Sequence, residues 1–353
     1  MALMELSPGC VSGHARMPGV CASLRAWSGT ALLAAATLAG AALPHDVAAQ
    51  AAAQAYPSRP IRFLIDFPAG GVSDILSRLV GERMTESLGR PLVFDNRPGA
   101  SGLIAYELGA RAPADGYTVL FVSTPFAFHL NLHEKLAFDT EKDFAPVALF
   151  AQFPNVLLVP SKSPIATLKE FLEAARSKPG GFNYGSLGVG SPQHLAMELF
   201  RTQNRFQATH VPYPGSPQAL AALIGGQTDV MFGNVPGALT QVRAGKARGL
   251  AMASSSRSSA LPDIPTFKEA GVPFEAVGFG GIVVPSGTPR AIVVRLNADA
   301  VKALNTPETA ERIRNVGGEP LPGTPEYFRH FLQQEMKRWG PVIVHSGAKG
   351  QVQ

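Results

Sequence analysis

The chain has 353 residues, of which 46% are hydrophobic and 16% charged, with 36 glycines and 30 prolines. This composition excludes a disordered tail protein and a coiled coil, and the length suffices for two ordinary domains. The formal net charge is +5, and the 31 lysines and arginines are scattered singly rather than clustered in a stripe. We therefore exclude nucleic-acid binding, while a general preference for anions stays open.

The first 49 residues have the pattern of an export signal. Two arginines precede an uncharged apolar stretch at 29–43, and small residues at 47–49 offer a cleavage site. Because the stretch is rich in Ala, Gly and Thr, a cleaved leader is favoured over a membrane anchor. The cysteines, Cys10 and Cys21, both precede it, so the mature chain would contain no disulfide. These features predict a cleaved signal peptide at 1–49 and a location in a bacterial periplasm.

From residue 61 onward, short apolar runs alternate with helical patterns, which predicts an α/β fold with a parallel sheet. The expected elements of the first series are a strand at 61–67, a helix at 73–88, a strand at 91–94, a helix at 102–111 and a strand at 118–122. Gly70 and Gly71 permit the tight turn between the first strand and the first helix.

A long apolar segment at 148–159, interrupted by Pro154, could carry the chain from one lobe to another. The second series that follows comprises helices at 167–177, 192–205, 217–224 and 236–243, and strands at 182–185, 209–212, 229–232 and 247–253. A further strand at 277–284 would return the chain, and helices at 289–304, 307–316 and 325–345 would end it. Without an internal repeat or a long linker, we expect two lobes that share two crossings and one cleft.

Three turns combine a glycine with the start of a helix, at 70–73, 190–192 and 215–217. A helix N-terminus leaves N–H groups free and carries the positive end of the dipole, so each turn could hold a carboxylate or a phosphate. Ordinary strand-to-helix turns look the same, so a purely structural role stays open for each. Asp66 lies in an apolar strand, and Asp74, in the first helical turn, could complement the dipole or hold a water or an amine. Together the turns predict an anion clamp.

Other chemistries lack their motifs. The glycine-rich runs match neither the phosphate-loop nor the dinucleotide pattern, and no Gly-x-Ser-x-Gly is present. Ser191 and His194 have the spacing of a helix cap rather than of a nucleophile and its base. His129 and His133 are four apart, but no carboxylate or cysteine motif completes a metal site. The sequence therefore predicts no catalytic residue, no metal and no cofactor.

Several stretches of the chain match one known family in the same order. They are FPAGG at 67–71 with Asp74, NRPGA at 96–100, ADGYTVL at 114–120, NYGS at 183–186, GS at 190–191 with His194, HVPY at 210–213, and LPDIPT at 261–266 with EAG at 269–271. In these stretches the chain resembles the substrate-binding proteins of tripartite tricarboxylate transporters, also called Bug or TctC-like receptors. The resemblance implies a type II periplasmic-binding-protein fold, in which two Rossmann-like lobes are joined by a hinge with a ligand cleft between them. Lobe one would hold 50–153, lobe two 154–276, and 277–353 would return to lobe one.

The same resemblance implies a function. The protein would capture a small organic carboxylate and deliver it to the membrane subunits of a tripartite tricarboxylate-type transporter, acting as a monomer and not as an enzyme. The implied ligand-binding residues are Pro68, Ala69, Gly70, Gly71, Asp74, Ser123 and Thr124 from lobe one, Ser186, Gly190, Ser191 and His194 from lobe two, and Tyr213, Gly215 and Asn234 on the far wall. Two alternatives stay open: a ligand-sensing protein that feeds a membrane kinase, and an exported carboxylate hydrolase.

One departure from the family concerns the ligand. Many members carry Tyr-Lys-Gly where this chain has Pro214 between Tyr213 and Gly215, so a cation near this loop is missing. We therefore expect a monocarboxylate or an aromatic acid rather than a tricarboxylate. Side chains at 126, 128 and 153, all phenylalanines, could form an apolar wall or belong to the core.

Overall fold

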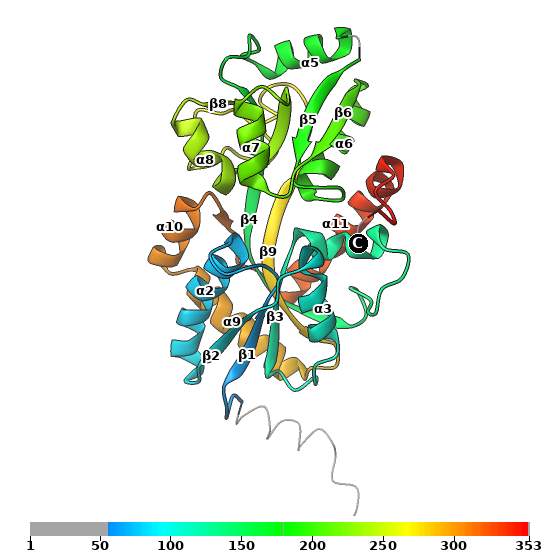
Figure 1. Ribbon diagram of the computed structural model, residues 1–353. Coiled ribbons are helices and arrows are strands. Elements are labelled where there is room, and N and C mark those ends of the chain that lie inside the picture. Colours follow the sequence, from blue (N-terminus) through cyan, green and yellow to red (C-terminus); the bar gives the residue numbers. More distant parts are fainter. Residues whose placement is uncertain (1–55, 179, 352–353) are drawn as a thin grey trace, which may run out of the picture. The chain divides into compact units, whose positions relative to one another are not determined.

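The computed structural model describes residues 56–178 and 180–351 (Figure 1). The predicted signal peptide at 1–49, and with it both cysteines, lies outside the described residues. Within the described part of the chain, no helix combines the length and the apolar character needed to cross a membrane.

The first series of elements alternates strand and helix, as predicted. It comprises β1 (Ile61–Ile65), α2 (Val72–Leu88), β2 (Leu92–Asn96), η1 (Ala100–Gly102), α3 (Leu103–Ala110) and β3 (Thr118–Ser123). Strand β1 pairs in parallel with β2 and with β3, so the loops that follow β1 and β3 leave the same edge of the sheet. Two short helical segments absent from the sequence prediction, η2 (Thr124–Ala127) and α4 (His129–Leu132), directly follow β3.

Strand β4 (Phe144–Pro160) contains the long apolar segment and is continuous through Pro154. Its first part pairs antiparallel with β9 (Val277–Pro285), and its second part pairs antiparallel with β7 (Val230–Asn234) and β8 (Ala247–Met252). Pro154 lies at the last pair with β9, next to the point where the partner strand changes. The missing N–H of a proline is tolerated at the end of a ladder, which explains why the strand is not broken there.

The second series of elements continues from β4. It comprises α5 (Leu168–Ser177), β5 (Phe182–Ser186), α6 (Pro192–Asn204), β6 (Ala208–Pro212), α7 (Ser216–Ile224) and α8 (Val235–Arg243), with β7 and β8 between and after the last two helices. Strand β5 pairs in parallel with β6 and β7. The main strand order is β2-β1-β3-β9-β4-β7-β5-β6, and β4 and β9 run side by side between the two groups of strands (Figure 1).

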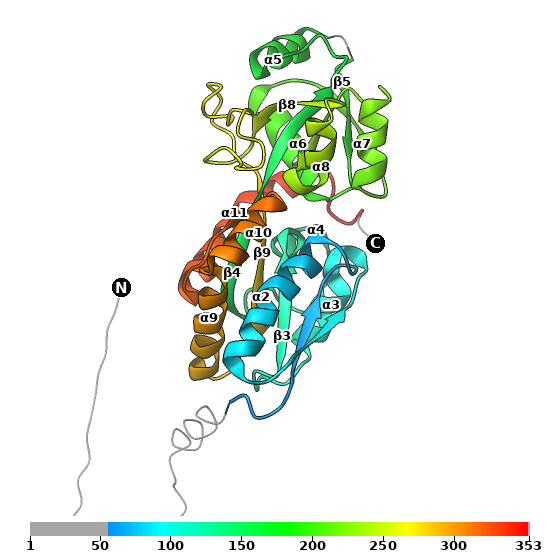
Figure 2. The same ribbon diagram turned by 90° about the vertical axis from the view of Figure 1, so that its left-hand side faces the viewer.

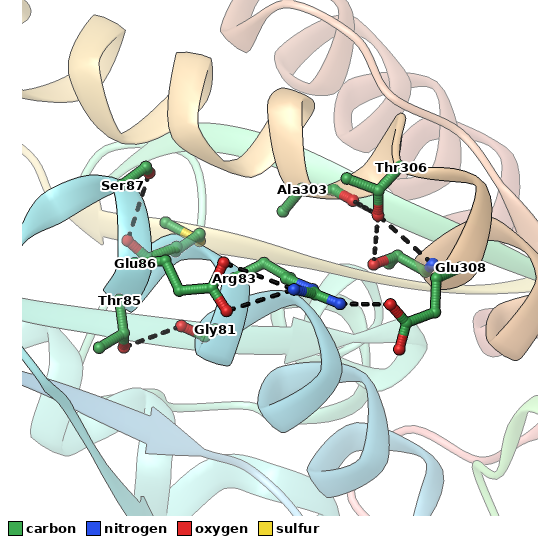
Figure 3. A network of polar contacts seen from close by, with 10 residues as sticks. Gly81, Arg83, Thr85, Glu86, Ser87, Ala303, Thr306 and Glu308 are labelled. Carbon is green, nitrogen blue, oxygen red and sulfur yellow. Dashed lines mark hydrogen bonds and ion pairs between the residues drawn. The ribbon is translucent and has the colours of Figure 1, made fainter.

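The last part of the chain packs around β4 and next to the first group of strands, which consists of β1, β2 and β3. It comprises α9 (Arg290–Leu304), α10 (Pro307–Asn315), β10 (Glu319–Pro320) and α11 (Pro325–Ser346). Figure 2 shows α9 beside α2. In Figure 3, Arg83 of α2 lies between Glu86 of its own helix and Glu308 of α10. All three side chains are partly exposed, so this network contributes little energy and mainly fixes how α10 meets α2.

Candidate ligand-binding site

A cavity of about 440 Å³ lies where the loops after β1, β3, β5 and β7 meet β4 and β9. Its walls come from both groups of strands, and its floor is formed by Phe153 and Asn155 of β4 and residues 278–280 of β9. In open α/β sheets, ligands bind beyond the carboxyl ends of the strands, which is the position of this cavity. A smaller cleft of about 190 Å³ between α2 and α9 contains the paired Arg83 and Glu86.

Helices α2, α6, α7 and α8 all begin at this cavity. Val72, Pro192, Ser216 and Asn234, which lie at or next to the first residues of these helices, line its wall. The first-turn amides of a helix have no intrahelical acceptor, and they carry a partial positive charge. The cavity therefore concentrates partial positive charge without a cationic side chain.

The lining of the cavity is mostly apolar, and none of its side chains is charged. The apolar part is formed by Phe67, Val72, Leu76, Phe121, Phe153, Leu187 and Phe279. The polar side chains are hydroxyls and amides, namely Ser73, Ser123, Thr124, Asn155, Gln193, Ser216 and Asn234. A bound anion would thus be neutralised by amides and hydroxyls while its carbon body contacts aromatic rings.

Hydrogen bonds hold the floor against the walls. The Asn155 side chain, only 3% exposed, donates from Nδ2 to the Ala276 carbonyl at 2.7 Å and accepts from Gln193 at 3.5 Å. The Thr124 hydroxyl accepts from the Phe279 amide at 3.0 Å. At Gly280 a Cβ atom would lie 2.5 Å from the Phe121 ring, so only glycine allows β9 to approach that ring so closely.

Of the residues implied by the resemblance, the structure places Pro68, Gly71, Ser123, Thr124 and Asn234 in the cavity wall. The remaining nine do not line this cavity, and these are Ala69, Gly70, Asp74, Ser186, Gly190, Ser191, His194, Tyr213 and Gly215. Gly215 and Ser191 are the N-cap residues of α7 and α6, and the Ser191 hydroxyl accepts from the His194 amide at 3.3 Å. Their role in the structure is to start helices whose next residues reach the cavity.

Asp74 is engaged within lobe one. Its carboxylate accepts from the Gly70 amide at 2.9 Å, from Arg78 at 2.9 Å and from Asn96 at 3.1 Å. Burial acts to raise the pKa of Asp74, but the bonds from Arg78, Gly70 and Asn96 outweigh it, and the pKa lies below its ordinary value. Asp74 therefore complements the dipole of α2 and holds the turn at Gly70, which matches the structural alternative left open by the sequence.

His194 belongs to a buried aromatic stack behind the cavity wall. Its ring lies 4.1 Å from the ring of His210, centroid to centroid, and it also stacks on Tyr184. Its Nδ1 accepts from the Gly190 amide at 3.1 Å, and the Ser186 hydroxyl is bonded to His210. Burial, with the neighbouring His210, lowers the pKa of His194 to about 4, so the ring is neutral at pH 7.

Of the three phenylalanines that could form an apolar wall or belong to the core, two belong to the core. Phe126 is 1% exposed and packs edge-on against Tyr106, and Phe128 packs against Trp339. Phe153 alone of the three lines the cavity. The rings of His129 and His133 stack 5.1 Å apart, and among residues 56–178 and 180–351 no group of three His, Cys, Asp or Glu is placed to hold a metal ion.

Several cavity residues were missed by the sequence analysis, namely Asn155, Gln193, Phe121 and Phe279, whereas Ser73 and Ser216 lie in turns that it singled out as candidate anion sites. For Asn155 a signal existed, because an amide inside the apolar run 148–159 needs a buried partner. Gln193 directly follows the first residue of α6, whose glycine-rich turn the analysis did single out. Nothing in the sequence showed that this residue, and not His194 next to it, would face the cavity.

Asp66 lies directly behind the cavity wall. The carboxyl is completely buried, and its Oδ2 accepts from the Ser123 hydroxyl at 2.6 Å and from the Tyr106 hydroxyl at 2.8 Å. Its Oδ1 has no hydrogen-bond partner among the described residues. Burial raises the pKa of Asp66 to about 6, although the hydrogen bonds from Ser123 and Tyr106 act in the opposite direction.

Comparison with known proteins agrees with this architecture. The family model described as tripartite tricarboxylate transporter family receptor matches residues 76–348. Protein BugT of Bordetella pertussis is 34% identical over 86% of this chain and 94% of its own length, and a UPF0065 protein from the tcbD-tcbE intergenic region of Pseudomonas sp. strain P51 is 37% identical over 87% and 93%.

Solved structures give the same result. Rpa4515 of R. palustris with adipate has a TM-score of 0.73 at 34% identity, covering 83% of this chain and 98% of that one. MatC (Rpa3494) of Rhodopseudomonas palustris with bound malate has a TM-score of 0.69 at 32% identity, covering 82% and 100%. The periplasmic binding protein BugD matches with a TM-score of 0.70 at 28% identity, covering 83% and 99%. The fold class predicted from the sequence, a periplasmic-binding-protein fold, is confirmed.

Proposed function

Because the chain belongs to the receptor family of tripartite tricarboxylate transporters, we propose that it binds a small organic carboxylate in the cavity and delivers it to the membrane subunits of such a transporter. We propose further that no bond of the ligand is made or broken, which the receptor description of the family and its binding-protein neighbours support. The observation that carries the proposal is the convergence of four helix N-termini on one cavity without a charged side chain in its wall.

This arrangement suits an anion that must be released again. Helix amides bind a carboxylate through fixed partial charges and need no cationic partner that would be left unpaired in the empty cavity. Two relatives of known structure hold dicarboxylates, adipate in one and malate in the other. Binding of a carboxylate at this position is therefore consistent with both the local physics and the family.

The wall favours a ligand with one carboxylate and an apolar body. Phe121, Phe153 and Phe279 supply aromatic surface, and burying three carboxylates in a cavity without a cation would leave most of their charge uncompensated. Of the two classes expected from the sequence, monocarboxylates and aromatic acids, both fit a cavity of about 440 Å³. A tricarboxylate does not suit it.

We assign the lobes to residues 50–153 with 277–353, and to 154–276, with β4 and β9 as the two crossings. The ligand would favour the closed arrangement by its higher affinity for it, and the transporter would bind the closed surface. We further propose that the receptor works as a monomer in the periplasm, which the predicted signal peptide and the family support.

The test is thermal unfolding of residues 50–353 against mono-, di- and tricarboxylates, aromatic acids and amino acids. A ligand at 100 times its dissociation constant stabilises the folded protein by about 2.7 kcal/mol, which is a shift of a few degrees. A selective shift with one carboxylate class supports the proposal. No shift with any carboxylate, once native mass spectrometry has excluded a ligand retained from purification, contradicts it.

A substitution at Gly71 tests whether the loop after β1 contacts the ligand. Gly71 lines the cavity with a φ of −76°, which a side chain can adopt, but a Cβ atom would lie 3.2 Å from the Pro68 carbonyl oxygen. Valine should therefore displace this loop, and we expect at least tenfold weaker binding. Ala69→Val, on the exposed part of the same loop, is the matched control and should leave the affinity unchanged. Equal affinity of Gly71→Val and wild type would remove the loop from the site.

A further inference from the structure

The two walls of the cavity differ in charge. The N-terminus of α2 has Asp74 in its first turn, and Asp66 lies buried beside Ser73 and Ser123. The first turns of α6, α7 and α8, on the opposite wall, contain no acidic residue. Arg78 pairs with Asp74, whereas Asp66 has no cationic partner among the described residues, so the wall formed by the loops after β1 and β3 carries a negative charge when Asp66 is ionised. On the opposite wall the first turns of α6 and α8 are capped by the neutral side chains of Ser191 and Asn234.

The Asp66 carboxylate also fixes the hydrogen-bonding role of Ser123. An ionised carboxylate can only accept, so the Ser123 hydroxyl must donate its single proton to Oδ2 at 2.6 Å. Tyr106 donates to the same oxygen from the other side at 2.8 Å, so Asp66 cannot turn away without losing both bonds. What Ser123 then presents to the cavity is an acceptor lone pair next to a buried negative charge, and this arrangement attracts a donor and repels a carboxylate.

We propose that the ligand binds in one orientation, with its carboxylate against the first turns of α6, α7 and α8 and with a hydrogen-bond donor of its own at Ser123. Asp66 is the positioning residue that selects the donor. This inference rests on the proposed function and names the ligand class within it: monocarboxylates that carry a donor group, such as a hydroxyl, at the end opposite the carboxylate.

The titration of Asp66 gives the preference a pH dependence. Burial raises the pKa of Asp66 to about 6, so the carboxyl is ionised at pH 7.5 and mostly protonated at pH 5. A protonated Asp66 can donate to Ser123, which frees the serine proton for the cavity and removes the preference for a donor.

The neighbouring groups do not titrate in this range. Burial raises the pKa of Tyr106 on α3 well above 10, and His129 beyond it has its pKa lowered to about 4 by burial. Asp74 on α2 is paired with Arg78. Burial acts to raise the pKa of Asp74, but hydrogen bonds from Arg78, Gly70 and Asn96 outweigh burial and keep this pKa below its ordinary value.

The test compares ligands that differ only at the far end. We would measure dissociation constants at pH 7.5 by calorimetry for 6-hydroxyhexanoate, hexanoate and adipate, and in parallel for 4-hydroxybenzoate, benzoate and terephthalate. In at least one set, wild type should bind the hydroxylated acid about tenfold more tightly than the unsubstituted acid, and the diacid most weakly. In Asp66→Asn, the ratio of the affinity for the hydroxy acid to the affinity for the diacid should fall by about tenfold. Ser123→Ala should bind the hydroxylated and the unsubstituted acid with equal affinity.

Asp95→Asn is the matched control, because it removes a carboxylate on the neighbouring strand β2, where Asp95 pairs with Arg62 and Arg97, without touching Ser123 or the cavity, and it should leave the ratios unchanged. At pH 5 the wild-type ratios should approach those of Asp66→Asn at the same pH, a comparison that cancels the titration of the ligands themselves. Binding by wild type without a preference for the hydroxylated acid in either set, or with ratios unaffected by Asp66→Asn, overturns the inference and leaves the proposed function intact. Failure to bind any carboxylate overturns both.

Discussion

Replacing Asp66 by asparagine should change the stability of the ligand-free protein in a pH-dependent way. Relative to wild type, the free energy of unfolding of the variant should be higher at neutral pH than at acid pH. The pKa of this carboxyl is raised by burial from 3.8 to about 6 in the folded protein. A raised carboxyl pKa means that the folded state binds the proton more tightly than the unfolded state. The stabilisation of the folded state by this protonated carboxyl is therefore fully present below the unfolded-state pKa of 3.8, and it is lost as the pH rises through the folded-state pKa of about 6.

The magnitude follows from the two pKa values. One pKa unit corresponds to 1.36 kcal/mol, so the gap between 3.8 and about 6 amounts to about 3 kcal/mol for a fully buried group. Asparagine has the same shape but does not titrate. About 0.6 kcal/mol of this amount is already lost at pH 4, so the difference in free energy of unfolding between Asp66→Asn and wild type should increase by about 2.4 kcal/mol from pH 4 to pH 8 in favour of the variant, whatever constant offset its altered hydrogen bonds add.

The assay is urea unfolding of residues 50–353 at a series of pH values, followed by the fluorescence of Trp339, which is buried against Phe128. Asp74→Asn provides a control of opposite sign. The lowered pKa of Asp74 contributes stability that is present above its unfolded value and lost as the pH falls, so this variant should lose stability relative to wild type as the pH rises. If the difference for Asp66→Asn is the same at pH 4 and pH 8, Asp66 does not carry a buried charge and the reasoning fails.

Two further predictions concern the bonds around the cavity. Thr124→Val should leave the Phe279 amide without its acceptor and lower the free energy of unfolding by about 1–3 kcal/mol, whereas Thr124→Ser keeps the hydroxyl and should behave as wild type in the same urea titration. Glu198→Gln should lower the free energy of unfolding by about 2 kcal/mol, because the buried Glu198 carboxylate accepts from Tyr184 at 2.7 Å and pairs with Arg201 at 2.6 Å. A variant as stable as wild type would show that this ion pair contributes no net stability.

The sequence predicted the order of helices and strands well because each turn carries its own local chemistry. Helix α6 illustrates this, since Ser191 caps it and Pro192 occupies its first position, as expected from the residue types alone. The direction of individual side chains was not predictable in the same way. Successive helical residues point about 100° apart, and only the packing of Tyr184 and His210 decides that His194 is buried while Gln193 reaches the cavity.

Polar residues inside apolar strands were the more informative signal. Asp66 ends the apolar run that forms β1, and Asn155 lies in the run that forms β4, and both make buried hydrogen bonds at the cavity. A buried polar group without partners costs more than a hydrogen bond returns, so each required a specific partner. The partners, Ser123 and the Ala276 carbonyl, lie 57 and 121 residues away, and no local pattern in the sequence identifies them.

The position of β9 has a consequence for the order of folding. In the sheet, β9 lies between β3 and β4 and pairs with both, although more than 110 residues separate it from either along the chain. Until residue 285 has been synthesised, β3 and β4 lack the strand that joins them, and the sheet of the first group stays incomplete. Such long-range pairing delays folding. A chain built in this way emerges largely before its first lobe can close, which fits the export proposed for this receptor.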